Sequence, residues 1–448
     1  MKQDLEMKGN TLAIVLLVVG LVVGAGAGYF LAPKGTTDGG DGGDGGDGGP
    51  IIEYKAPLEG MDIQLGRIAS TTSGLETDTP LFKDLIEPDI NAYLEILGMD
   101  TTMTYLIDDA NSQPAIHLEK VQGFKSMDIN VFMGGGWSSM ASSALSYCND
   151  NDMLMWSSSS TSPTLALEGD NLYRMCPDDT IQAPAIAEML RSHAIDAIIL
   201  FYRGDAWADG IVNILDPVYT SKGGVILERV RYAGESTEFS NYLQTIENIA
   251  QGAVAEYGAE HVGIELIAFQ ESAVIATQAQ DYPTIYNDIV WFGSDGTALT
   301  TQLHDDAPSQ TVQLKIHSTY AAPAESAKFM RLYDIYFDLL SMPFGYYSAC
   351  SYDIAWVLLE SMHEAQSIDA LDLIPLQMTT SENNFGASGW NRLNPAGDRY
   401  GSQYQIWSLR ENPDAEGGYE FYVSGLYDDV SDSVTWYLSE MDYVPPTP

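Results

Sequence analysis

From Asp62 onward the chain alternates short apolar runs with longer amphipathic segments, and this pattern restricts the possible folds more than any other feature of the sequence. Runs typical of strands occupy residues 63–69, 103–108, 129–135 and 152–158, and helix-length segments separate them. Strands that alternate with helices in this way pair in parallel and are covered by helices on both faces. We therefore predict a doubly wound α/β lobe in this part of the chain.

The same alternation resumes further along the chain. A helix is predicted at residues 183–192. Four more strand-like runs follow it, at residues 196–202, 224–232, 262–269 and 288–296. A chain of 448 residues is also too long for one ordinary core. We predict two successive α/β lobes joined near residues 176–184, with the binding site in the cleft between them.

Two serine-rich loops lie within Gly134 to Pro163, where predicted strands end. Ser138 and Ser139 follow the third strand, and the serines and threonine of residues 157–161 follow the fourth. In open α/β sheets, ligands bind in the crevice outside the carboxyl ends of the strands. Hydroxyl and backbone N–H groups in such loops suit a small anion such as a carboxylate. The alternative is that these residues only form loops.

The N-terminal part of the sequence predicts attachment to a membrane. Residues 11–31 carry no charge, which is long enough for one bilayer-spanning helix. Because basic residues precede this segment, we expect residues 1–10 in the cytoplasm and the body outside. A cleaved secretory signal, or cleavage after Gly9 as in the class III signals of some archaeal solute-binding proteins, are the alternatives. Residues 36–50 repeat the triplet DGG four times and predict a flexible, acidic tether.

Composition and motifs exclude several function classes. The chain has 63 acidic and 20 basic residues, a net charge of −43 that repels nucleic acid. Its six histidines are too scattered for a metal site, and it has neither a P-loop nor a nucleophile elbow. The three cysteines fit no disulfide framework and favour buried, free thiols. We expect a protein that is not an enzyme and that needs no metal or cofactor.

From residue 62 to residue 436, a series of motifs resembles the type I periplasmic (solute-binding) proteins of the branched-chain amino acid class, which serve ABC importers. The motifs stand in the family's order: IQLGRIASTTSG, LIDDANSQP, WSSSSTSPTLA, LYRMCPDD, GDAWADG, FGSDG, YDIAWVLLESM, FGASGWNRLNPAGDR and YQIWSL. The resemblance implies two lobes joined by three crossovers. It implies a first lobe of residues 62–180 completed by about 318–365, and a second lobe of residues 183–317 completed by about 366–445.

The resemblance also implies a set of ligand-binding residues. Ser138, with Ser139 beside it, stands where the family holds the ligand carboxylate, and Ser159 and Thr161 stand in the loop that contacts carboxylate and ammonium. From the second lobe, Asp295 replaces the acidic residue that pairs with the ammonium group, Trp207 replaces an aromatic tyrosine, and Gln270 falls near another family aromatic. Without the resemblance, Asp295 could equally be a residue of a turn, and Trp207 could equally pack in the core. Trp137 departs from the family's small residue and predicts a narrower or flatter pocket.

The resemblance implies a solute-binding protein that captures a branched-chain-like amino acid, or a small amide, outside the cytoplasm and delivers it to ABC permease subunits. Amide- and urea-type ligands occur among related family members. Because the acidic side chain at Asp295 is shorter than the one in the family, such ligands remain alternatives. A ligand-sensing ectodomain and a structural cell-surface protein are the alternative functions on the same fold.

Overall fold

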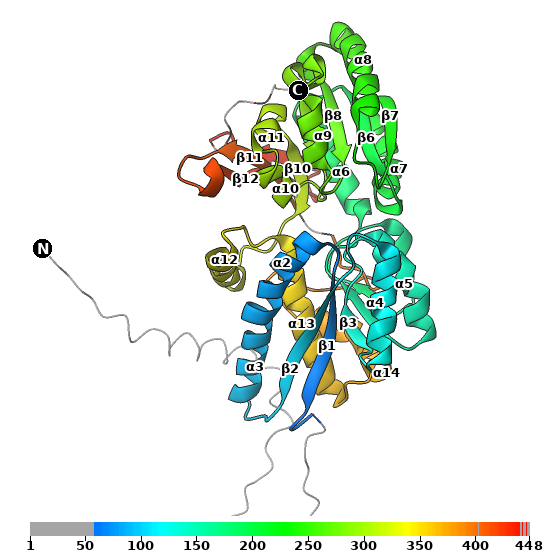
Figure 1. The fold of residues 1–448 in the computed structure, drawn as a ribbon, viewed down its shortest axis with the longest axis vertical. Helices are drawn as coiled ribbons and strands as arrows, with labels where there is room; N and C mark the ends of the chain where they lie inside the picture. The colour runs from blue at the N-terminus through cyan, green and yellow to red at the C-terminus, as the bar shows by residue number, and fades with distance from the viewer. Residues whose placement is uncertain (1–57, 402, 440, 442–444, 446–448) are drawn as a thin grey trace, which may run out of the picture. The chain divides into compact units, whose positions relative to one another are not determined.

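The computed structural model describes residues 58–401, 403–439, 441 and 445 (Figure 1). The predicted cytoplasmic segment 1–10, membrane helix 11–31 and tether 36–50 lie outside these residues. Among the described helices, none is both long enough and apolar enough to cross a bilayer.

The first lobe is built on a five-stranded sheet in which every pair of neighbouring strands is parallel, as the sequence predicts. Parallel sheets are buried on both faces, which explains why these strands read as apolar runs. In spatial order the strands are β2 (Thr102–Asp109), β1 (Asp62–Ala69), β3 (Val131–Met133), β4 (Leu154–Ser157) and β5 (Leu172–Arg174).

The helices of the first lobe come from both early and late parts of the chain. The early ones are α2 (Thr72–Pro80), the π-helical η1 (Leu81–Ile86), α3 (Glu87–Ile96), α4 (Pro114–Ser126), α5 (Ser138–Asp150) and the short η2 (Pro163–Leu165). The late ones are α12 (Ala327–Leu340), α13 (Tyr346–Ala365), α14 (Ala370–Leu373), η5 (Ile374–Leu376) and α15 (Gln377–Asn383).

The helical region after β1 extends from Thr72 to Ile96 through α2, η1 and α3. It begins at Thr72, because the Thr71 side chain caps it by accepting a hydrogen bond from the Gly74 N–H at 2.8 Å. The π-helical η1 ends at Ile86, and Pro88 lies in the first turn of α3.

The second lobe has an eight-stranded sheet that is mixed and not wholly parallel as expected. Strands β6 to β10 are parallel, whereas β11, β12 and β13 continue the sheet antiparallel, and the connections from β11 to β12 and from β12 to β13 are hairpins. In spatial order the strands are β13 (Ser433–Trp436), β12 (Tyr419–Asp428), β11 (Tyr404–Glu411), β10 (His317–Ala321), β9 (Val290–Gly293), β8 (Val262–Ile267), β6 (Ala197–Gly204) and β7 (Val225–Ala233).

Helices cover this sheet over its parallel part. They are α6 (Asp179–Ser192), α7 (Ala206–Ser221), α8 (Ser240–Tyr257), η3 (Ala259–His261), α9 (Ser272–Ala279), η4 (Thr284–Asp288), α10 (Thr301–Asp305) and α11 (Pro308–Leu314), and η6 (Glu416–Gly418) joins β11 to β12. Two apolar clusters fill the two sides of the sheet, one under α8 and α9 and one under α6 and α7.

The chain passes between the lobes three times, after β5, after β10 and after α15. The division of the late segments differs from the expectation. Residues 317–321, expected mostly in the first lobe, form a strand of the second sheet, and residues 370–383, expected in the second lobe, pack in the first. The physical reason is burial: Leu373 lies in the core beneath β4, and Gln377 accepts a hydrogen bond from the Trp156 indole at 2.8 Å.

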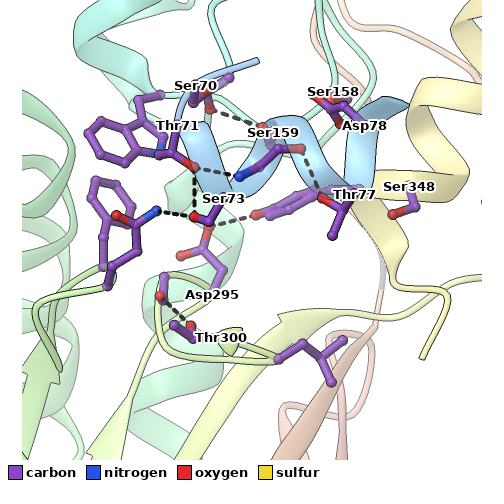
Figure 2. A pocket seen from close by; sticks show the side chains of 18 of the residues that line it. Ser70, Thr71, Ser73, Thr77, Asp78, Ser158, Ser159, Asp295, Thr300 and Ser348 are labelled. Atoms are coloured by element: carbon purple, nitrogen blue, oxygen red, sulfur yellow. Dashed lines mark hydrogen bonds between the residues drawn. The ribbon is translucent and has the colours of Figure 1, made fainter. Parts of the chain in front are cut away.

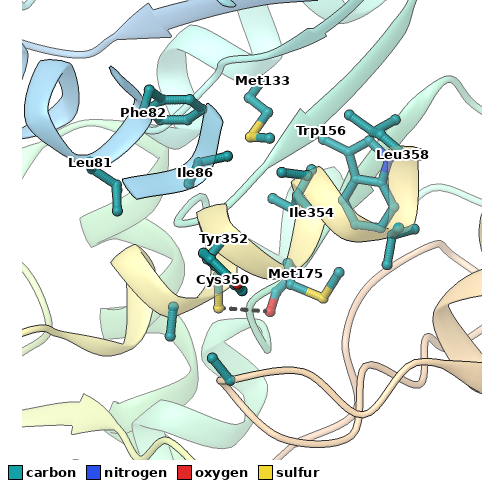
Figure 3. Packing of buried hydrophobic residues seen from close by; sticks show 14 of the residues in the cluster. Leu81, Phe82, Ile86, Met133, Trp156, Met175, Cys350, Tyr352, Ile354 and Leu358 are labelled. Atoms are coloured by element: carbon teal, nitrogen blue, oxygen red, sulfur yellow. Dashed lines mark hydrogen bonds between the residues drawn. The ribbon is translucent and has the colours of Figure 1, made fainter. Parts of the chain in front are cut away.

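The core of the first lobe is centred on α13, which packs against η1, β3 and β4 (Figure 3). Cys350 on this helix is buried and donates to the Met175 carbonyl oxygen at 3.2 Å. Cys148 and Cys176 are also buried and free, which confirms the prediction of three buried thiols.

Candidate functional site

A cavity of about 320 Å³ lies between residues of the two lobes, and most of its lining is polar (Figure 2). Its walls come from the loops that follow β1, β3 and β4 in the first lobe, and from those that follow β8 and β9 in the second. All of these loops leave the carboxyl ends of parallel strands, where open α/β folds bind ligands. Hydroxyl groups predominate in the lining, from Ser70, Thr71, Ser73, Thr77, Ser158, Thr300 and Ser348 among others.

The cavity includes five of the seven residues that the sequence predicts for the site: Ser138, Ser159, Trp207, Gln270 and Asp295. Ser139 and Thr161 do not line it. Ser139 follows Ser138 on α5 and therefore points along a different face of the helix, and the Thr161 hydroxyl is buried behind the loop. Sequence spacing places a residue on the right loop but does not decide which side its side chain takes.

The two serine-rich loops are joined to each other by hydrogen bonds. Ser138 Oγ accepts a hydrogen bond from the Ser162 N–H at 3.1 Å, which leaves its own hydroxyl proton for another acceptor. Ser159 Oγ donates to the Gly136 carbonyl at 2.9 Å. Helix α5 begins at Ser138 without a side-chain cap, and the Met140 N–H donates to the Trp137 carbonyl oxygen at 2.9 Å, so the N–H groups of Ser138 and Ser139 are the ones left for a ligand. Together these groups suit a carboxylate.

Buried polar residues fix the shape of these loops from behind. His117 Nε2 accepts a hydrogen bond from the Gly135 N–H at 2.8 Å, which requires this nitrogen to be unprotonated. Burial lowers the pKa of His117 to about 3, so the ring stays neutral. Gly135 has φ of +60°, and a Cβ there would lie 2.8 Å from Ala141 Cβ, so the turn requires glycine.

Arg174 at the end of β5 supports the second serine loop. It is fully buried and donates from Nη1 to the carbonyl oxygens of Ser160 and Ser162, at 3.0 and 2.8 Å. Its Nε donates to Asp398 Oδ1 at 2.5 Å, and Asp398 lies on the third passage between the lobes. This ion pair therefore connects the binding loop to the connection between the lobes.

On the second-lobe side, Asp295 follows β9, and its carboxylate accepts hydrogen bonds from two neutral donors. Its Oδ1 accepts from Gln182 Nε2 at 3.0 Å and its Oδ2 from the Tyr347 hydroxyl at 2.5 Å. Burial raises the pKa of Asp295, and the two donors partly oppose the rise. No basic side chain pairs with this carboxylate among the hydrogen bonds and ion pairs of the described residues, so a cationic group of a ligand would complete it.

Asp179 is a second buried carboxyl close to the site. Its N–H donates to the Thr161 carbonyl oxygen at 2.9 Å, and it begins the helix that carries Gln182. Neither of its carboxylate oxygens has a hydrogen bond of ordinary geometry. Burial raises the pKa of Asp179 well above its usual range and the nearby Asp295 charge adds to this, whereas the neighbouring Thr161 hydroxyl opposes it.

Replacing Asp179 by asparagine is expected to stabilise the ligand-free protein at pH 7.5 by about 1–3 kcal/mol, because a buried carboxylate without partners is costly. A carboxyl whose pKa is raised by folding stabilises the protein fully below about pH 4, and loses this contribution as pH rises through its folded pKa. The advantage of asparagine should therefore shrink toward pH 4.

Urea unfolding at the two pH values measures this effect, with the exposed Asp281→Asn in the same lobe as the control. If Asp179→Asn instead lowers the free energy of unfolding equally at both pH values, the Asp179 carboxylate is paired in the folded protein.

Trp207 lines the cavity as part of an aromatic stack. Its ring lies on Phe269 with centroids 4.2 Å apart, and Phe269 lies on Trp137 of the first lobe at 4.5 Å. The guanidinium of Arg203 lies over Phe269 at 4.6 Å. Trp207 is only 3% exposed. It therefore packs in the core of its lobe and also forms part of the cavity wall. Trp137 closes one wall of the cavity by stacking on Phe269.

Several lining residues were missed by the sequence analysis. Tyr347 lies in the first turn of α13, and Gln302 comes from the short helix α10 and donates to Ser73 Oγ at 3.5 Å. Gln270, which was predicted, donates to the same oxygen at 3.3 Å. Arg67 and Asp78 also line the cavity. A signal existed for Arg67, which is a charged residue within an apolar strand.

A family model described as "Receptor family ligand binding region" matches residues 87–412, which is most of the chain. The chain belongs to this family. Among proteins with curated sequences, an uncharacterized protein of Methanocaldococcus jannaschii is 25% identical over 399 residues, which cover 84% of this chain and 91% of the relative.

Solved structures show the same fold for this family member at low identity. A leucine-binding protein, LivK, from Thermotoga maritima has a TM-score of 0.64 and 16% identity, covering 83% of this chain and 99% of its own. A solute-binding protein of an ABC transporter from Rhodopseudomonas palustris, in complex with benzoate, has a TM-score of 0.63 and 13% identity, covering 82% and 95%. The two-lobed type I periplasmic-binding-protein fold expected from the sequence is therefore confirmed.

Proposed function

We propose that this chain is a solute-binding protein that captures a free amino acid, or a small amide, outside the cytoplasm and delivers it to the permease subunits of an ABC-type importer. The observation that carries this proposal is the pairing of opposite chemistries in one cavity. The N–H groups of Ser138 and Ser139 and the Ser138 hydroxyl offer donors on one side, and the partly buried Asp295 offers an acceptor on the other.

This arrangement suits the two ends of an amino acid. A carboxylate would accept hydrogen bonds at the start of α5, where the helix dipole also favours negative charge. An ammonium group would give the partly buried Asp295 the cationic partner that it lacks within the protein. A benzoate-type ligand has no such group and would leave Asp295 uncompensated, which is why an amino acid is the better candidate.

In this proposal the protein binds its ligand without changing it, and neither metal nor cofactor takes part. The body is held at the outer side of the cell membrane by residues 11–31 and separated from it by residues 36–50. A ligand-sensing ectodomain is the second candidate, favoured by the description of the family model as a receptor ligand-binding region.

Isothermal titration calorimetry of the protein with amino acids, small amides and benzoate tests the proposed ligand class. We expect at least one amino acid or amide to bind, with a dissociation constant of about 10 μM or tighter, and we expect benzoate to be silent. Binding of benzoate with silence across all amino acids and amides would contradict the proposal.

A further inference from the structure

One end of the cavity is formed by an ion pair between Arg67 on β1 and Asp78 on α2. Arg67 Nε and Nη2 both donate to Asp78 Oδ2, at 3.0 and 2.7 Å. The two side chains are 8% and 15% exposed, and the guanidinium also lies over the Phe82 ring at 5.2 Å. In Figure 2, Asp78 lies well apart from Asp295. The cavity therefore has two separate charged regions.

This ion pair is incompletely satisfied by the protein. Arg67 Nη1 is buried and has no hydrogen-bond partner among the described residues. Asp78 uses only Oδ2 to bind Arg67. Arg67 and Asp78 both line the cavity, so a ligand group placed against them displaces water from a charged pair and gains binding energy only where it returns hydrogen bonds to that pair.

The surroundings of the ion pair are polar as well. Thr77 and Ser73, on the same helix as Asp78, also line the cavity, and Ser73 accepts hydrogen bonds from Gln270 and Gln302 of the second lobe. An aliphatic ligand side chain placed here would remove water from a charged pair without replacing its hydrogen bonds. The pair has no net charge, so an acidic side chain would face Asp78 and a basic one would face Arg67.

We infer that the Arg67–Asp78 pair selects an amino acid whose side chain is uncharged and hydrogen-bonding, that is, one ending in a carboxamide or a hydroxyl group, and not a branched-chain aliphatic one. This inference rests on the proposed function, because it assumes that the cavity holds an amino acid. It concerns only the end of the ligand that lies away from Asp295.

The first test is calorimetry of the full chain with L-glutamine, L-asparagine, L-serine, L-threonine, L-leucine, L-isoleucine, L-glutamate and L-lysine. At least one of the four uncharged polar amino acids is expected to bind about tenfold or more tightly than any of the others. Leucine or isoleucine as the tightest ligand would overturn the inference and leave the proposed function standing. Silence toward all eight amino acids would overturn the inference, and silence toward the small amides as well would overturn the proposed function.

The second test changes the charge of the pair. Asp78→Asn leaves Arg67 as an uncompensated cation with a hydrogen-bonding neighbour, so glutamate should gain about tenfold or more relative to glutamine. Asp84→Asn, an exposed position further along the same helical region, is the matched control and should leave this ratio unchanged. An unchanged ratio in Asp78→Asn would place the ligand side chain away from the pair and overturn the inference.

A third variant replaces the whole ion pair with apolar residues. Arg67→Met with Asp78→Leu should reduce affinity for the uncharged polar amino acid about tenfold or more without reducing that for leucine. Circular dichroism and thermal melting confirm that each variant is folded, and if the double variant does not fold, Asp78→Asn decides the question alone. Retention of the polar preference in a folded double variant would contradict the inference.

Discussion

Replacing Asp295 by asparagine is expected to weaken binding of an amino acid by roughly 2–5 kcal/mol, which is a loss of about 30-fold to several thousandfold in affinity. The reason is that the carboxylate is partly buried and has only neutral donors, Gln182 and Tyr347, within the protein. Asparagine keeps the size of the side chain and one acceptor for these donors but removes the charge that compensates a ligand ammonium group.

Calorimetry with the tightest amino-acid ligand measures this loss. Asp288→Asn removes an exposed charge from the same lobe and serves as the control, because it separates a local effect from the long-range field of a chain with a net charge of −43. Equal affinity in the Asp295 variant and the wild type would remove this residue from the binding site. The affinity should also fall as pH is lowered through the raised pKa of Asp295, since the protonated carboxyl no longer attracts a cation.

Asp398→Ala is expected to destabilise the protein by about 3–5 kcal/mol, because it leaves the fully buried Arg174 without its charged partner. It should weaken ligand binding too, since Arg174 holds the carbonyl oxygens of Ser160 and Ser162. Urea unfolding gives the change in stability, and calorimetry gives the change in affinity.

The double variant Arg174→Met with Asp398→Leu separates the two contributions. Without either charge, the loss of stability should be clearly smaller than in Asp398→Ala, whereas ligand binding should stay weak because the loop has lost its donors. A double variant that binds ligand as tightly as the wild type would show that the loop keeps its shape without Arg174.

The strand and helix alternation predicted the first sheet well because parallel strands buried on both faces leave a local signal in the sequence. The assignment of residues 370–383 to a lobe had no such signal. Short helices such as α14 have similar sequence patterns wherever they pack, and contacts made in the folded protein, such as that of Trp156 with Gln377, reveal the lobe to which this segment belongs. The antiparallel end of the second sheet was missed for the same reason, since strand direction depends on distant pairing.

The candidate site shows the same division. Ser138, Ser159 and Asp295 follow strands directly, so the resemblance places them at the cavity, and the structure brings them together there. The position of Thr161 depends on which way a loop turns, which local sequence does not specify. Arg67 and Asp78 lie on two elements that come into contact only in the folded lobe, so the sequence pattern could not predict that they pair.

The late position of α13 in the chain has a consequence for protein synthesis. This helix lies at the centre of the first lobe, yet all the parallel strands of the second lobe precede it in the sequence. As the chain emerges from the ribosome, the N-terminal lobe cannot close its core before residue 365 has been made, whereas strands β6 to β10 are already complete. Domains often fold in the order of their synthesis, but here the lobe that is begun first is finished after the parallel sheet of its neighbour, and its exposed strands depend on that interval being short.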